Sequence, residues 1–222
     1  MSDLLPLFPL PNVVLFPNVF LPLHIFEPRY RQMVADALSS DRMIGMVLLK
    51  PGWEHEYEGH PPVYPIGSNG VITHVERLDD GRYNIVLRGV ERFRIIQENH
   101  DRAYRRASIE PIVERALAAD DRVALRRQRS RLEVLLAPAI DRDLGQTRRP
   151  GETRTGADPL IPSGMGDEEL VNALAQYLDL EPVEKQALLE RQCLRSRAES
   201  LVELLEMKIM MGRAASPSHV AH

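Results

Sequence analysis

A short polar segment holds the side chains of this sequence that are best suited to metal chemistry. Two histidines and three glutamates lie close together there: Glu54, His55, Glu56, Glu58 and His60. Imidazole and carboxylate groups are ligands for zinc and other divalent metals. Their spacing matches no common metal site, and the neighbouring proline and glycine residues indicate an exposed loop. We therefore interpret the segment as a solvated loop and expect neither a bound metal nor a cofactor.

The sequence lacks the motifs that carry nucleotide hydrolysis or peptide-bond cleavage in common enzymes. Residues Pro162–Gly166 include glycines but no lysine, so they do not form a phosphate-binding GxxxxGK[ST] loop, and no HExxH, CxxC or GxSxG occurs. His24 and His74 have no accompanying nucleophile, and we interpret both as structural residues. Cys193 lies near an apolar helical stripe and is interpreted as a small core residue. We predict that the chain is not an enzyme.

Aromatic residues of the same polar segment are better candidates for binding. Large amphipathic rings give a wide contact area at a small entropic cost, so they suit the capture of a peptide. We predict that Trp53, Tyr57 and Tyr64 form a peptide-binding surface. An alternative is that Trp53 folds back and fills one end of the predicted barrel. Phe16 and Phe20 lie within apolar strands and are expected in the core.

These residues must be positioned by a framework of short strands. The segment Leu4–Tyr30 is apolar but is interrupted by six prolines, which excludes one continuous helix or a membrane span. Strands are predicted over residues 4–10, 13–16, 20–24, 43–49, 63–66, 70–78, 83–88, 90–96 and 104–112, with a helix from Pro28. Asp79–Gly81 is typical of a hairpin turn, and Gly89 indicates a bulge or corner. We expect residues 1–112 to form an α+β domain, a small antiparallel β-barrel with one early helix.

The remainder of the chain has the periodicity of helices. A connecting helix is predicted over residues 113–140, because leucines recur on one face of it. Residues 141–166, rich in Pro, Gly, Thr and Arg, are expected to form a mobile loop. A helical bundle is predicted over residues 167–211, with a flexible tail at 212–222. Its helices are expected to begin at Asp167, at Pro182 and near Ser196, the second running through Leu194. Five arginines between Arg122 and Arg131 spread around the connecting helix, which favours a solvated surface over a nucleic-acid-reading face.

Two blocks of sequence resemble a known family. LPLFPLPNVVLFPNVFLPLHIFEPRYRQMV, from Leu5, is similar to the start of the amino-terminal, substrate-recognition domain of Lon proteases, and its LHIFEPRY form resembles free-standing bacterial members and the Lon-like domain of cereblon. IGSNGVITHVERLDDGRYNIVLRGVERFRI, Ile66–Ile95, agrees with the family in order and spacing. The resemblance implies a pseudobarrel of the PUA-like type. It does not extend to the ATPase and serine–lysine peptidase modules of full-length Lon, nor to cereblon's zinc ligands, because the chain has one cysteine.

Charge and composition exclude other classes of protein. A net charge of −4 over 222 residues argues against a general binder of nucleic acids or acidic membranes. The single cysteine excludes an intrachain disulfide and fits a reducing compartment. The start Met-Ser-Asp lacks the basic residues of a signal peptide. We therefore expect a cytoplasmic protein without membrane association.

The resemblance implies a non-catalytic module that binds unfolded or tagged polypeptide segments, as an adaptor or regulator for a separate protease. The alternative is an RNA-binding protein, because this barrel type resembles the RNA-binding PUA fold. Salt separates the two, since phosphate contacts weaken steeply with ionic strength and apolar contacts do not.

Overall fold

The structure, a computed structural model, describes residues 4–56, 59–146 and 164–214, without the side chains of residues 55–56, 138–146 and 212–214. The strands are β1 (Leu5–Leu10), β2 (Phe20–Ile25), β3 (Met43–Leu48), β4 (Ile66–Arg77), β5 (Tyr83–Asn99) and β6 (Arg106–Ile112). The helices are α1 (Pro28–Leu38), the 3-10 turn η1 (Trp53–Glu56), α2 (Ala119–Gln146), α3 (Asp167–Tyr177), α4 (Pro182–Leu189) and α5 (Leu194–Ala214). The mixed α+β class is the predicted one.

The chain divides into two compact units. The sheet unit comprises Met1–Glu114 together with Asn172–Arg191, and the α2–α5 unit comprises Arg115–Val171 together with Gln192–His222. The sheet unit therefore includes α4 and the end of α3, which the sequence analysis grouped with the other carboxyl-terminal helices. The exact domain boundaries stay a prediction.

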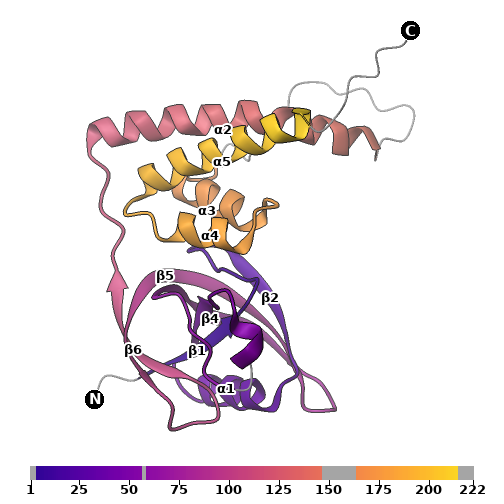
Figure 1. The fold of residues 1–222 in the computed structure, drawn as a ribbon, viewed down its shortest axis with the longest axis vertical. Coiled ribbons are helices and arrows are strands. Elements are labelled where there is room, and N and C mark those ends of the chain that lie inside the picture. The colour runs from indigo at the N-terminus through magenta and orange to yellow at the C-terminus, as the bar shows by residue number, and fades with distance from the viewer. Residues whose placement is uncertain (1–3, 57–58, 147–163, 215–222) are drawn as a thin grey trace. The chain divides into compact units, whose positions relative to one another are not determined.

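The strands of the sheet unit form one curved, six-stranded sheet in the order β2-β5-β4-β3-β1-β6, and β5 also pairs with β6 (Figure 1). The long strand β5 makes this possible, because its first half pairs with β2 and its second half pairs with β6. The sheet thus curls back on itself, while β2 pairs with β5 alone among the named strands. The result is a curled sheet rather than a regularly closed barrel.

One strand pair departs from the expected antiparallel arrangement. β1 and β3 run parallel, with Leu7 opposite Gly45 and Leu10 opposite Leu48. Parallel neighbours need a long crossover connection, and here that connection contains β2 and α1. α1 begins at Pro28, whose fixed φ and missing N–H suit the first turn of a helix.

The turn predicted at Asp79–Gly81 and the bulge predicted at Gly89 are both confirmed. The turn before β5 has Gly81 at φ 82°, and the Leu78 N–H donates to the Arg82 carbonyl at 2.9 Å. In the β4–β5 pairing, Gly70 faces Gly89 while Asn69 faces Glu91, so the residue between Gly89 and Glu91 bulges out.

The core of the sheet unit consists of two clusters. The first core cluster lies under α1 and includes Leu15, Met33, Ile44, Ile85 and Leu87. The second core cluster contains Leu5, Leu7, Val47, Leu49, Val63, Phe93 and Ala107. Phe16 is fully buried, as predicted, but Phe20 is 51% exposed. The core expectation for Phe20 is wrong because β2 alternates: Leu21, Leu23 and Ile25 face inward, so Phe20 faces outward.

Several predicted element bounds are also corrected. Residues 13–16 form no strand, although Val14, Leu15 and Phe16 are buried. α2 continues through Pro138 to Gln146, so residues 141–146 are helical rather than part of the expected loop, and residues 147–163 lie outside the described residues. α4 ends at Leu189 rather than Leu194, and α5 begins at Leu194. α3 begins at Asp167 as predicted.

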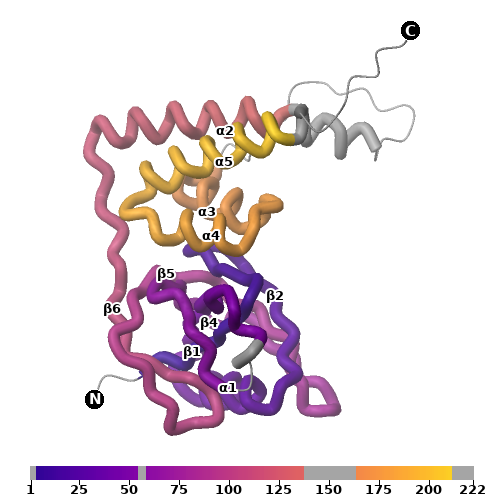
Figure 2. The backbone as a smooth tube through the Cα atoms, viewed as in Figure 1, coloured from indigo at the N-terminus to yellow at the C-terminus, as the bar shows by residue number. Residues whose placement is uncertain are grey.

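Within the α2–α5 unit, α2 and α5 run side by side, as both the ribbon and the tube show (Figures 1 and 2). Leu125 and Leu132 of α2 are buried, and Leu201 of α5 is fully buried. Ion pairs join the two helices at Arg131–Glu206 (2.7 Å) and at Arg195–Asp121 (2.9 Å). None of the helices in the described part of the chain combines the length and the apolar character that crossing a membrane requires.

Candidate functional site

A loop that leaves and rejoins the sheet between β3 and β4 contains the residues predicted to bind a peptide. We call residues 50–64 the β3–β4 loop. Its two ends are joined by a hydrogen bond from the Lys50 N–H to the Pro62 carbonyl (2.8 Å) and by an isolated antiparallel bridge between Leu49 and Val63. These backbone contacts hold the base of the loop in a definite position on the sheet.

The aromatic residues of this loop differ in their surroundings. Trp53 is half-buried and packs against the second core cluster, to which Val63 also belongs. Tyr64 is half-buried, and the Lys50 ammonium lies 5.9 Å from the centroid of its ring. Tyr57 lies outside the described residues. The Trp53 ring therefore combines core packing with partial exposure, and the peptide-binding role of the three aromatics stays a prediction.

A pocket of about 70 Å³ opens beside the same loop, within the sheet unit. We call it the Arg29–Arg105 pocket, after the two cations in its wall. The loop contributes His60 and Pro61, and Leu49 links the pocket to the second core cluster. The sequence analysis did not single out either arginine, although Arg29 belongs to the family-like motif EPRY that opens α1.

Each arginine of the pocket is held by a carboxylate. Arg29 forms an ion pair with Glu27 at 2.9 Å, and its guanidinium carbon lies 4.7 Å from the centroid of the Tyr30 ring. Arg105 is buried and forms an ion pair with Glu98 at 3.1 Å. Burial lowers the pKa of Arg105 from its ordinary value, partly offset by the Glu98 carboxylate.

Two further groups of the pocket wall have shifted pKa values. The Tyr104 hydroxyl donates to the Asp36 carboxylate at 2.7 Å, and burial together with this hydrogen bond raises the pKa of Tyr104 to about 12. The His60 ring lies 4.0 Å from the His100 ring, centroid to centroid. Burial, then the charges of His100 and Arg105, lower the pKa of His60. The surroundings of the His60 ring thus favour its neutral form.

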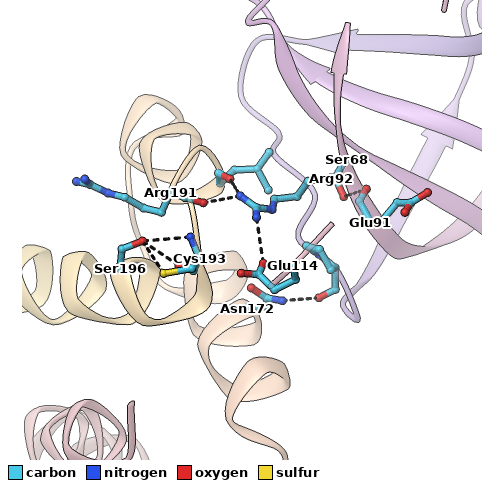
Figure 3. A network of polar contacts seen from close by, with 10 residues as sticks. Ser68, Glu91, Arg92, Glu114, Asn172, Arg191, Cys193 and Ser196 are labelled. Carbon is cyan, nitrogen blue, oxygen red and sulfur yellow. Dashed lines mark hydrogen bonds and ion pairs between the residues drawn. The ribbon is translucent and has the colours of Figure 1, made fainter. Parts of the chain in front are cut away.

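On another side of the sheet unit, a buried arginine joins β5 to the end of α4 (Figure 3). Arg92 is 2% exposed. Its guanidinium donates to two carbonyl oxygens, those of Leu189, the last residue of α4, and of Arg191, two residues beyond it. It also forms an ion pair with Glu114 at 3.1 Å. The helix end therefore has a side-chain cap supplied from the sheet.

Two buried amide side chains of α3 bind the irregular segment that precedes β2. The Gln176 side chain accepts a hydrogen bond from the Phe16 N–H at 3.1 Å. The Asn172 side chain, labelled in Figure 3, donates to the Pro17 carbonyl, with 3.1 Å between nitrogen and oxygen. These contacts satisfy backbone groups of the irregular segment before β2 that no strand pairs.

The outward face of β2 carries an aromatic surface that the sequence analysis missed. Phe20 is 51% exposed, Phe26 is 61% exposed and Tyr177 is 67% exposed. The Tyr177 hydroxyl donates to the Phe20 carbonyl at 2.9 Å, which places the two residues together. We call Phe20 and Tyr177, together with Phe26 one residue beyond the end of β2, the β2 aromatic surface. The alternation of β2 was the available signal, because the aliphatic set Leu21, Leu23 and Ile25 fits the core better than Phe20 does.

The two histidines interpreted as structural lie on the sheet. His24 is exposed, and its Nδ1 lies 2.7 Å from the Asn84 side-chain oxygen while the Arg82 guanidinium lies 3.2 Å from its Nε2. An arginine can only donate, so Nε2 accepts and the proton is on Nδ1. His74 is exposed on β4. Neither arrangement includes a nucleophile.

Cys193, the arginines of α2 and the segment considered for metal binding were also singled out in the sequence. Cys193 is half-buried, with its Sγ 3.5 Å from the Ser196 hydroxyl. Of the arginines on α2, Arg129 pairs with Asp167 at 3.0 Å and Arg131 with Glu206. Among residues whose side chains the structure describes, no cluster of three or more His, Cys, Asp and Glu could hold a metal ion. His55, Glu56 and Glu58 of the considered metal segment are outside that set.

Comparison with known proteins agrees with the fold. The family described as the ATP-dependent protease La (LON) substrate-binding domain matches residues 4–207. The Lon protease of Anaeromyxobacter dehalogenans is 26% identical over 208 residues, which are 92% of this chain and 23% of that protein. Lon protease 2 of Myxococcus xanthus is 26% identical over 206 residues, which are 93% of this chain and 24% of that protein. The chain spans about a quarter of the length of these relatives.

Solved structures of similar fold carry related descriptions. The N-terminal domain of the Mycobacterium avium complex Lon protease matches with a TM-score of 0.64 and 16% identity, covering 92% of this chain and 98% of that one. A Lon N-terminal domain protein from Xanthomonas campestris matches with a TM-score of 0.57 and 22% identity, covering 90% of this chain and 98% of that one. At these identities the likeness shows the fold.

Proposed function

Because this chain belongs to the family of LON substrate-binding domains, we propose that it is a non-catalytic module that binds unfolded or tagged polypeptide segments. The family match carries the proposal, since it covers residues 4–207 and is to a substrate-binding domain rather than to a protease domain. The role is that of an adaptor or regulator of a separate protease. A single cysteine, typical of a reducing compartment, supports a cytoplasmic location.

We place the polypeptide at the β3–β4 loop. Trp53 and Tyr64 there are both half-buried, so each ring combines fixed packing with accessible area. Such rings are effective anchors because they lose little conformational freedom on binding. The neighbouring Arg29–Arg105 pocket supplies a recess at the edge of the same loop. The β2 aromatic surface is the rival location, because its three rings are more exposed.

Fluorescence anisotropy of labelled, reduced and carboxymethylated α-lactalbumin, a permanently unfolded chain, tests the proposal. The protein should bind it, and the double variant Trp53→Ala/Tyr64→Ala should weaken binding by at least roughly thirtyfold, the loss expected for a single anchor of about 2 kcal/mol. The matched control is Phe20→Ala/Phe26→Ala on the β2 aromatic surface. A loss confined to the control variant would move the site to β2. Absence of binding by the unmodified protein would disprove the proposal.

Two control experiments are needed. One tests whether Trp53→Ala destabilises the fold, and the other tests whether the protein binds RNA instead of a polypeptide. Thermal melting of Trp53→Ala measures its packing against the second core cluster, and a loss of about 3–5 kcal/mol would show that the ring acts mainly as a core residue. A labelled single-stranded RNA is titrated at low and high salt beside the polypeptide. Tight, salt-sensitive RNA binding without polypeptide binding would favour the alternative RNA-binding function.

A further inference from the structure

We propose that the Arg29–Arg105 pocket binds the α-carboxylate at the carboxyl terminus of a polypeptide. This inference rests on the proposed function and assigns to the pocket one chemical group of the substrate. The two cations of the pocket wall come from α1 and from the segment just before β6. Among the described residues that line the pocket none is an aspartate or glutamate, so the charged groups of its described wall are the two arginines, which pair with Glu27 and Glu98.

Arg105 provides fixed donors at this position. It is buried, and its guanidinium is held on one side by Glu98 and on another by the Pro61 carbonyl. A guanidinium carries five N–H donors in a rigid plane, and these two acceptors use two of them. The planar arrangement matches the two oxygens of a carboxylate, which a bidentate arginine contact recognises.

Arg29 is positioned by its own contacts in the same wall. Glu27 holds the guanidinium at 2.9 Å, and the Tyr30 ring lies beneath it. Tyr30 is itself fixed against Phe8, with 4.4 Å between ring centroids. The second cation is thus ordered before a ligand arrives, which lowers the entropic cost of binding.

The pocket has room for a small charged group. Its volume of about 70 Å³ accommodates a carboxylate. Pro9 and Leu49 in the wall give an apolar surface beside the cations. A chain end offers this combination, because its last residue has a carboxylate next to a side chain.

The electrostatic environment of His60 agrees with this assignment. The charges of Arg105 and Arg29 both lower the pKa of this ring, after burial and the neighbouring His100, and only Glu98 raises it. A carboxylate bound at the arginines should raise the pKa of this ring, because a nearby negative charge favours the protonated form of a histidine. The His60 ring is therefore a built-in reporter of pocket occupancy.

The test compares two forms of one peptide and follows the reporter. A fluorescein-labelled peptide ending in Ser-Leu-Ala is titrated as the free acid and as the carboxyl-terminal amide. The free acid should bind at least about tenfold more tightly, as expected for charge-assisted hydrogen bonds. In NMR, N-acetylalanine should raise the pKa of the His60 ring, assigned through His60→Gln, whereas N-acetylalanine amide should not raise it and inorganic phosphate should raise it less, because it lacks the side chain that contacts Pro9 and Leu49.

Substitutions of single arginines test whether the preference for the free acid arises at the Arg29–Arg105 pocket. Arg29→Gln should remove the preference for the free acid, and Arg105→Lys should reduce it because the amine lacks the planar pair of donors. Arg88→Gln, an exposed arginine of β5, should leave it unchanged. Thermal melting confirms that each variant folds. Equal affinity for acid and amide, an unaltered preference in Arg29→Gln, or an equal response to phosphate would overturn the inference. The first of these results would leave the proposed function intact, whereas failure to bind α-lactalbumin would disprove that function separately.

Discussion

The Arg92 guanidinium donates a hydrogen bond to the Leu189 carbonyl at 2.9 Å, although the two residues are 97 positions apart in the chain. The last carbonyls of a helix have no partner within the helix, and a buried end must find one elsewhere. Here a strand residue supplies it, and the Glu114 carboxylate balances the charge. The sheet and α4 are therefore joined by directed contacts as well as by apolar packing.

Loss of this guanidinium should destabilise the sheet unit. We expect Arg92→Met to lower the free energy of unfolding by about 3–5 kcal/mol, because it leaves a half-buried carboxylate and two carbonyls without this donor. Urea unfolding followed by circular dichroism measures the change. Arg88→Met, at an exposed position of the same strand, is the control and should stay within about 0.5 kcal/mol of the parent. Equal effects of the two substitutions would contradict the assigned role.

The bulge in β5 should tolerate no side chain at Gly89. A Cβ atom there would overlap the Phe16 carbonyl oxygen, and that backbone is itself held by neighbouring hydrogen bonds. Gly89→Ala should therefore cost about 1–3 kcal/mol or more, as overpacking does. Gly164→Ala is the matched control, because its Cβ would meet nothing within 4 Å. Differential scanning calorimetry of both variants gives the comparison, and a stable Gly89→Ala protein would show that the approach is looser than described.

The hydroxyl of Tyr104 should make stability depend on alkaline pH. In the unfolded chain a tyrosine ionises near pH 10, whereas the folded pKa of Tyr104 is about 12. The folded state holds this proton more tightly, so its contribution is present below pH 10 and is lost as the pH rises toward 12. The stability advantage over Tyr104→Phe, about 1 kcal/mol at neutral pH, should shrink across that interval. Urea midpoints of both proteins at several pH values measure it, and a constant difference would argue against the shift.

The purified chain should neither hydrolyse ATP nor cleave casein. Its sequence holds no phosphate-binding loop and no motif that pairs a nucleophile with a base. A coupled phosphate-release assay and casein electrophoresis check both activities. ATPase activity that rises with protein concentration and persists through repurification would refute the non-catalytic assignment.

Local features of this fold were predictable because short-range chemistry determines them. The helix start at Pro28, the turn at Gly81 and the bulge at Gly89 each follow from a residue with unusual backbone freedom or restriction. The alternation of exposed and buried side chains in β2 also predicts that Phe20 faces outward. Its apolar character favoured the core, while its position in the alternating set favoured the outside, and the position prevailed.

The parts that were not predictable depend on residues far apart in the chain. Arg92 follows a bulge in an alternating strand, and nothing nearby indicates that α4 covers it. Arg105 is similar, because its guanidinium donates to the Pro61 carbonyl of the β3–β4 loop, which is 44 positions away in the chain. The Arg29–Arg105 pocket joins α1, this loop and the segment before β6, so no single stretch of sequence contains it.

The end strand β2 also bears on how this protein behaves at high concentration. The Phe20 carbonyl points away from β5, since it accepts a bond from the Tyr177 hydroxyl, and Pro22 two residues later is oriented to the same side. Proline has no N–H, so this edge offers an incomplete row of donors to any strand of another molecule. A sheet that ends in this way resists stacking edge to edge into fibrils. The same edge disfavours the addition of an extended strand from any other polypeptide.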